Sequence, residues 1–134
     1  AIEVCFQTGK KYSDLRKNTN AKRSFTSKKI GLLVEREALF NAINSRTHNM
    51  IADGWVGEAK KVHSDKQLNP LNTVGYKELF AYFEGQYTME QAIEKIKTNT
   101  RRYAKRQMTW FRKDESITWF PPSNISAMID YILE

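Results

Sequence analysis

Apolar residues recur at helical spacing along most of this chain, with polar and charged residues between them. Two short apolar runs, KKIGLLV at 28–34 and ITWF at 117–120, predict strands instead. We therefore expect a mainly α protein with one or two short strands, which belong to a sheet whose other strands lie outside these residues. The predicted helices cover residues 1–7, 35–52, 55–63, 75–84, 89–111 and the apolar stretch after 123.

Turn and capping residues indicate where these helices begin and end. Thr88 and Gln91 have the spacing of a capping box, which predicts the start of the longest helix. Ser13 is expected to cap a short second turn, and Ser123 is expected to cap the last helix. The expected stops and loops lie at Thr8-Gly9, 18–28, Asp53-Gly54, 64–70, Gly85 and Pro121-Pro122.

Composition fits one globular domain or a fragment of a larger one, since 40% of the 134 residues are hydrophobic. No apolar run is long enough to cross a bilayer. The single cysteine, Cys5, argues against both an internal disulfide and a structural zinc site, so a reducing compartment such as the cytoplasm is expected. Residues 1–7 begin a helix without a capping residue, which indicates a segment of a longer protein.

Charge is concentrated in two stretches of the chain. The net charge is +7, and 22 residues are Lys or Arg. Residues 10–29 hold eight of these cations against one acid, Asp14, and residues 95–113 hold eight more with no acid. Two solvated faces would explain such stretches, but clustering this strong favours an anionic partner such as a nucleic acid.

The predicted helix at 35–52 carries an arginine in an unexpected position. At 100° per residue, Leu39, Ile43 and Met50 form one apolar stripe, and Arg46 falls on the same side of the helix. An arginine that points into an apolar face needs an anionic partner, because it stays charged. The partner is either a carboxylate of another helix, in a buried ion pair, or a phosphate in a cavity.

The predicted helix at 89–113 is apolar on one side and cationic on the other. Thr100 and Gln107 fall on the apolar side, where each either satisfies a backbone group or reaches a substrate. No acid at i±4 relieves the cations, so a phosphate backbone is favoured over a solvated face. The cations form two rows: Lys97, Arg101, Lys105 and Arg112, and beside them Lys95, Arg102, Arg106 and Lys113.

Common catalytic motifs are absent from the chain. It contains no GxxxxGK[ST], GxGxxG or GxSxG sequence. His48 and His63 are isolated and lack metal-ligand spacing. These residues alone therefore show no complete active site.

Two stretches carry a longer pattern: LNTVGYKELFAYFEG at 71–85 and NTRRYAKRQMTWFRK at 99–113. They resemble the C-terminal signature of the tRNA dimethylallyltransferases, also called tRNA isopentenylpyrophosphate transferases. That signature is a VGY-[KR]-[EQ] helix start followed by T-R-x-x-A-K-R-Q-x-T-W-x-R. Residues 1–17 resemble the family's RALEVY-x-x-TG-[KR]-x-x-S-x-L segment, and residues 39–62 its L-x-x-x-I-x-x-R-x-x-x-M-x-x-x-G-x-x-x-E-[VA] segment.

The resemblance implies a reaction. These enzymes move the dimethylallyl group of dimethylallyl diphosphate onto the exocyclic N6 amine of adenosine 37, just 3′ of the anticodon. The adenine is flipped from the stacked loop into a channel that the diphosphate enters from the other side. The implied partners are a tRNA anticodon stem-loop and dimethylallyl diphosphate, with Mg²⁺ expected in the full-length enzyme and no metal bound by these residues.

The resemblance also assigns roles to residues. The family arginine of the I-x-x-R segment faces the diphosphate and matches Arg46, which is expected to neutralise charge on the leaving pyrophosphate. The T-R-x-x-A-K segment and the loop before the VGY helix contact tRNA in the family. The implied tRNA-binding residues are Lys66, Gln67, Gly75, Tyr76, Lys77, Thr100, Arg101, Arg102, Lys105, Arg106, Gln107 and Arg112.

The chain departs from the family by omission: the phosphate-binding loop, the aspartate that serves as general base and most of the helical insertion domain are absent. The resemblance implies that residues 1–28 end this insertion domain and its linker, and that 29–134 form the C-terminal helical part of an α/β P-loop-type catalytic core. We expect a monomer that is inactive by itself. Two alternatives stay open: an adenylate dimethylallyltransferase, which modifies a free nucleotide, and an RNA-binding helical module without chemistry.

Overall fold

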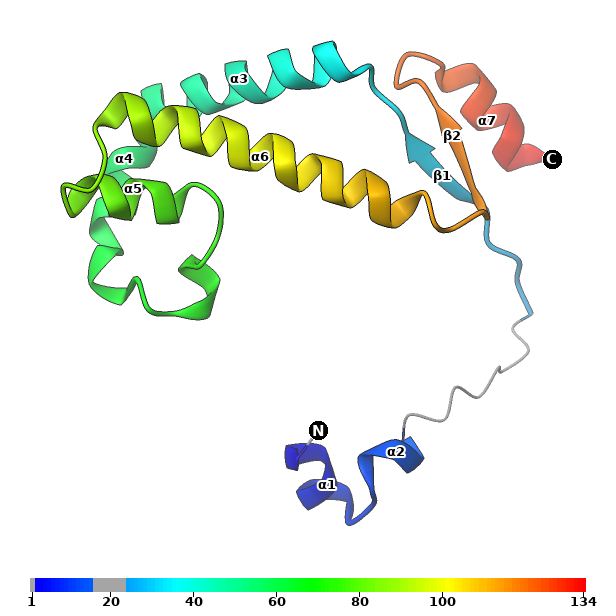
Figure 1. The fold of residues 1–134 in the computed structure, drawn as a ribbon. Helices are drawn as coiled ribbons and strands as arrows, with labels where there is room; N and C mark the ends of the chain where they lie inside the picture. The colour runs from blue at the N-terminus through cyan, green and yellow to red at the C-terminus, as the bar shows by residue number, and fades with distance from the viewer. Residues whose placement is uncertain (1, 16–23) are drawn as a thin grey trace.

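Figure 1 shows the fold in a computed structural model, which describes residues 2–15 and 24–134. The α-helices are α1 (Ile2–Thr8), α2 (Tyr12–Leu15), α3 (Arg36–Ala52), α4 (Trp55–Lys61), α5 (Tyr76–Phe83), α6 (Met89–Phe111) and α7 (Ile125–Leu133). Two single-turn 3-10 helices, η1 (His63–Asp65) and η2 (Asn69–Leu71), lie between α4 and α5, and the strands are β1 (Lys29–Leu32) and β2 (Ile117–Phe120). The prediction of a mainly α protein with two short strands is confirmed.

Helices α3 to α6 pack together at one end of the long helix α6. Helix α6 contacts α3 and α5, and α4 contacts both α3 and α5. The core between them is a cluster of Ala59, Leu79, Phe80 and Ile96. Leu79 and Ile96 are the largest fully buried side chains. This core is small, so each of its members contributes a large share of the stability.

The two strands are parallel neighbours, in register with Lys29 opposite Ile117. The chain leaves β1 along α3 and returns along α6 to β2, because parallel strands need a long crossover (Figure 1). Lys29 Nζ and Asp114 Oδ2 form an ion pair of 2.6 Å that joins β1 to the turn before β2. Hydrogen bonds from Lys29 and then Ser116 lower the pKa of Asp114 to about 2.

Helix starts agree with the sequence at one position and differ at two. Thr88 Oγ1 accepts from Gln91 N at 3.2 Å, and the Gln91 side chain accepts from Thr88 N at 2.9 Å, so the predicted capping box begins α6. Asn124, and not Ser123, caps α7, because its Oδ1 accepts a backbone N–H of the first turn at 3.3 Å. Ser13 lies within α2 rather than before it.

The loops also agree in part with the sequence. Residues 24–28 of the predicted loop at 18–28 are non-helical, and residues 18–23 lie outside the described residues. The 64–70 region includes parts of η1 and η2 instead of being irregular throughout. Within residues 2–15 and 24–134, no helix is long and apolar enough to span a membrane.

Candidate functional site

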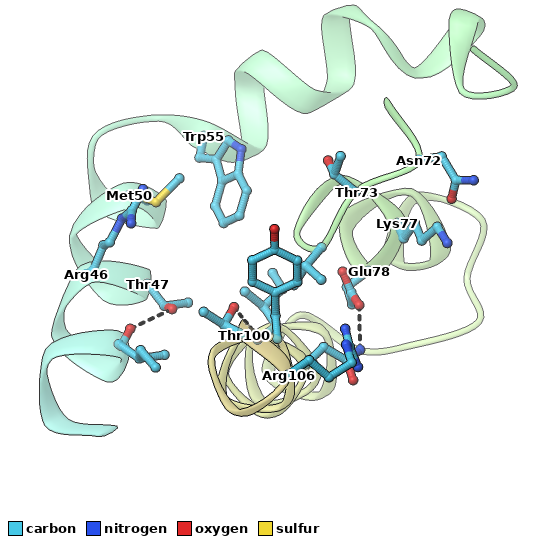
Figure 2. Close-up of a pocket in the computed structure, with 15 residues that line it drawn as sticks. Arg46, Thr47, Met50, Trp55, Asn72, Thr73, Lys77, Glu78, Thr100 and Arg106 are labelled. Atoms are coloured by element: carbon cyan, nitrogen blue, oxygen red, sulfur yellow. Dashed lines mark hydrogen bonds between the residues drawn. The ribbon is translucent and has the colours of Figure 1, made fainter. Parts of the chain in front are cut away.

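A cavity of about 710 Å³ lies between α3, α4, the turn before α5, and α6; we call it the central cavity (Figure 2). Its lining combines apolar side chains with three cations, so it suits a small ligand with an apolar end and an anionic end. The lining residues are Ile43, Arg46, Thr47 and Met50 from α3, Trp55 from α4, Asn72, Thr73, Val74, Lys77 and Glu78 from the turn and α5, and Ile96, Asn99, Thr100, Tyr103 and Arg106 from α6.

Four residues named from the sequence meet at this cavity: Arg46, Lys77, Thr100 and Arg106. They come from three helices, α3, α5 and α6. None of the three cations forms an ion pair with a carboxylate in the described part of the chain. Arg106 lies 5.8 Å from the centre of the Tyr103 ring. The lining therefore holds three cations against one carboxylate, Glu78, and its excess of positive charge favours an anionic ligand.

Arg46 lines the cavity, as one of the two predicted alternatives requires. The buried line of α3 is formed by Ile43 and Thr47, which are 8% and 5% exposed, whereas Arg46 is exposed on the cavity wall. Ile43 and Met50 of the predicted stripe line the cavity together with Arg46, so this side of α3 faces the cavity. The alternative of a buried ion pair receives no support, because the described residues provide no carboxylate partner for Arg46.

Thr100 has the first of the two roles that the sequence analysis left open for it. Its Oγ1 donates to the Ile96 carbonyl at 2.8 Å, so the hydroxyl satisfies a backbone group. The oxygen keeps acceptor capacity on the cavity side. Gln107 is exposed and does not line the cavity, so its contact with a substrate stays a prediction.

The cationic rows of α6 are not uniformly exposed. Lys97 is 7% exposed, and its Nζ donates to Glu94 Oε1 at 2.6 Å. This bond is the main cause of a lowered pKa for Glu94. The expectation that no acid relieves these cations is therefore wrong at Lys97, because the acid lies at i−3 and not at i±4.

Arg101 also turns away from solvent, toward α3. Its Nη2 donates to Asn44 Oδ1 at 2.6 Å, and its guanidinium lies 5.1 Å from the centre of the Phe40 ring. Its Nε is buried and has no hydrogen-bond partner within the described ranges. Arg101 therefore connects α6 to α3 and does not line the cavity; its contact with tRNA stays a prediction.

The remaining cations of α6 form an exposed surface. Arg102 Nη1 donates weakly to Asn99 Oδ1 at 3.4 Å. Trp110, which the sequence analysis did not single out, is 68% exposed at the end of the same helix. An exposed aromatic side chain within a run of cations is typical of a surface that stacks on nucleic-acid bases, so its position in the cationic run would have singled out Trp110. On α6 and at its C-cap, the exposed predicted residues outside the cavity are Arg102, Lys105, Gln107 and Arg112.

The turn before α5 has an unusual backbone. Gly75 is the N-cap of α5 with φ +104°, and a Cβ there would lie 2.2 Å from the Trp55 ring. Tyr76 donates its hydroxyl to Glu58, and this bond is the main reason for its raised pKa. Neither Gly75 nor Tyr76 lines the cavity, although the neighbouring Lys77 does. These two residues therefore support the wall of the cavity without lining it.

Glu78 is a site residue that the sequence analysis missed. It is 6% exposed and lines the cavity (Figure 2), and its two carboxylate oxygens accept two hydrogen bonds. Gly75 N donates to its Oε2 at 2.6 Å, and Asn99 Nδ2 donates to its Oε1 at 2.7 Å. The glutamate three residues after the glycine cap was the available signal.

The predicted tRNA-contacting loop lies away from the cavity. Lys66 forms an ion pair with Glu84, which lowers the pKa of this carboxyl, and His63 Nε2 lies 3.3 Å from the same Glu84 oxygen. Gln67 is exposed. Neither Lys66 nor Gln67 lines the cavity. Among the described residues there is no group of three His, Cys, Asp or Glu side chains that could hold a metal ion.

Comparison with known proteins agrees with this arrangement. Residues 1–114 match the profile of the family described as IPP transferase. The chain is 53% identical to tRNA dimethylallyltransferase 2 of Azobacteroides pseudotrichonymphae over 98% of this chain and 45% of that protein. It is 47% identical to tRNA dimethylallyltransferase 1 of Phocaeicola vulgatus over 98% of this chain and 44% of that protein.

Solved structures show the same relationship. The tRNA isopentenylpyrophosphate transferase of Bacillus halodurans superposes with a TM-score of 0.75 at 38% identity, over 79% of this chain and 38% of that one. The enzyme of the same description from Staphylococcus epidermidis gives 0.73 at 31% identity, over 99% of this chain and 45% of that one. The chain thus spans less than half the length of these relatives. By sequence and by fold, the chain belongs to the IPP transferase family, the family of the tRNA dimethylallyltransferases.

Proposed function

We propose that this chain is the C-terminal part of an enzyme that prenylates the N6 amine of the adenosine 3′ of the tRNA anticodon. In this proposal the central cavity receives dimethylallyl diphosphate, and the exposed cations of α6 hold the tRNA. One observation carries it: Arg46, Lys77 and Arg106 converge on one cavity with an apolar part and have no carboxylate partner among the described residues. A diphosphate supplies the missing negative charge, and a prenyl chain fits the apolar part.

In the proposed reaction, a bond forms between the adenine N6 and C1 of the dimethylallyl group. The bond between C1 and the diphosphate oxygen breaks, pyrophosphate leaves with the electron pair, and N6 loses a proton to a base. Negative charge therefore grows on the leaving oxygen in the transition state. Arg46 would neutralise this charge, because its planar guanidinium can bind two oxygens at once. Lys77 would hold another phosphate oxygen as a point charge, and the guanidinium of Arg106 would hold the remaining oxygens.

The general base, the phosphate-binding loop and Mg²⁺ would come from outside these residues. The central cavity does not fit a divalent cation by itself. Its single carboxylate, Glu78, already accepts two hydrogen bonds, and its charged neighbours are cations. Mg²⁺ prefers a set of free oxygen ligands, so in this proposal the diphosphate and the other half of the enzyme hold the ion.

For the target adenine of the tRNA to enter the site, it must leave the base stack of the anticodon loop. Unstacking costs a few kcal/mol, which contacts to the phosphate backbone must offset. Arg102 and Lys105 are exposed on α6 within the stretch 96–106 whose other residues line the cavity, and Arg112 is exposed at the C-cap of the helix. Their placement next to the cavity supports a tRNA acceptor over a free nucleotide, which would not need them.

The test is a prenyl-transfer assay on the full-length parent enzyme, with labelled dimethylallyl diphosphate and an anticodon stem-loop RNA or AMP as acceptor. We expect transfer to the RNA and none to AMP. Arg46→Gln should abolish most of the transfer, whereas Arg36→Gln, on the same helix but outside the cavity, should not. Transfer to AMP alone would establish the free-nucleotide alternative. RNA binding without any transfer would establish a binding module.

A further inference from the structure

We infer that Glu78 is a positioning residue of the proposed reaction: with Asn99 it fixes the turn before α5 against α6, so that Lys77 and Arg106 face one diphosphate. This inference rests on the proposed function. We call the two side chains and their bond the Glu78–Asn99 link.

The link joins two walls of the central cavity. The Glu78 Oε2 accepts the backbone N–H of Gly75 at 2.6 Å, which closes the first turn of α5. Its Oε1 accepts from Asn99 Nδ2 at 2.7 Å, across 21 residues of sequence. A carboxylate oxygen only accepts, so Asn99 must present its amide nitrogen to Glu78 and its oxygen to the other side. That oxygen accepts from Arg102 Nη1 at 3.4 Å.

Helix capping alone would not require this arrangement. A capping glutamate needs only the bond to the N-terminal backbone, and it is normally exposed to water. Glu78 is 6% exposed and has no cationic partner within the described part of the chain. Burying a carboxylate on two neutral donors costs desolvation energy and adds little net stability. What it does provide is a defined direction, because both oxygens are held at short distances.

The link lies between the cations that the reaction would use. Lys77 is the neighbour of Glu78 on α5, and Arg106 lies two turns beyond Asn99 on α6; both line the cavity. Fixing α5 to α6 at this point therefore fixes the separation of the two cations. A shift of about 1 Å in such contacts can lower turnover by about a hundredfold.

Exchanging the polarity of the link provides a sharp test. In Glu78→Gln, one of two donors, Gly75 N–H or the Asn99 amide, loses its acceptor. In Asn99→Asp, two carboxylates face each other. In the double variant E78Q/N99D, the glutamine oxygen accepts from Gly75 N and its amide donates to the new carboxylate, so both bonds return. Each single variant should lower kcat/KM for the stem-loop RNA by about 10- to 100-fold, and the double should return to within about fivefold of the wild type.

A stability control separates positioning from folding. Val62→Ala thins the same hydrophobic core at a residue that does not line the cavity. Each variant is assayed in the full-length enzyme, well below its own Tm, and Val62→Ala should then keep kcat/KM despite a lower Tm. Glu78→Gln with wild-type kcat/KM, or a double variant no better than the single ones, would overturn the inference. Val62→Ala with an equal loss would show a purely structural role. An inactive wild type would instead refute the proposed function itself, and with it any positioning role in that reaction.

Discussion

Replacing Gly75 with alanine tests the turn that forms one wall of the cavity. Gly75 has φ +104° and ψ −61°, a backbone conformation that costs an L-residue about 1–3 kcal/mol. The new Cβ would also lie 2.2 and 2.3 Å from two atoms of the Trp55 ring, so the ring or the turn must move. Overpacking of this kind costs about 1–3 kcal/mol more. We therefore expect Gly75→Ala to lower the free energy of unfolding by about 2–6 kcal/mol.

Two other glycines separate these contributions. Gly54 has φ +100° with nothing within 4 Å of a Cβ, so Gly54→Ala carries the backbone strain alone and should cost about 1–2 kcal/mol. Gly57 lies within α4 in open space, so Gly57→Ala should stabilise the protein by about 0.5–1 kcal/mol.

Urea unfolding of the chain, followed by far-UV circular dichroism and by tryptophan fluorescence, measures all three variants. With Trp110 and Trp119 replaced by Phe in every variant, the emission of Trp55 should change in the folded state of Gly75→Ala only, because only there does the new Cβ displace the ring. If Gly75→Ala cost no more than Gly54→Ala, the close approach to Trp55 would contribute nothing. The account of a turn fixed by that contact would then be refuted.

Three further predictions concern charge. Arg46→Lys should remove about 3 kcal/mol of transition-state stabilisation and so lower kcat of the full-length enzyme, with little change in Tm. Near-normal turnover would exclude the diphosphate role. Lys105→Gln should reduce the slope of log K against log salt for stem-loop binding by about one unit at unchanged stability, and an unchanged slope would mean that Lys105 meets no phosphate. Arg101→Gln should reduce the slope and also lower the Tm, because it removes the bond to Asn44. The folded state lowers the pKa of Asp114 from 3.8 to about 2, so this carboxylate stabilises the fold above about pH 4 and loses its effect as pH falls toward 2. Asp114→Asn should therefore lower the Tm at pH 6 and match the wild type near pH 2, and equal Tm values at both pH values would refute the contribution.

Features that depend on neighbours along the chain were determined by the sequence alone. The capping box of Thr88 and Gln91 was predicted correctly, because a capping bond spans three residues and needs nothing from the rest of the fold. The strands at 29–32 and 117–120 followed from short apolar runs for the same local reason. The resemblance that led to the family also rests on linear patterns.

Tertiary structure decided which side of each helix is covered, and the sequence predicted this less well. Periodicity placed Lys97 on the exposed cationic side, yet Lys97 is buried. It also left open whether Arg46 meets a carboxylate or lines a cavity, and only the packed helices show that it lines a cavity. A helical wheel gives the angle between residues, but it does not say which angle the neighbouring helix occupies. The Glu78–Asn99 bond joins residues 21 positions apart, and such a bond exists only because α5 and α6 pack at that point. The cavity itself has the same origin: three helices must meet before its cations can face one ligand.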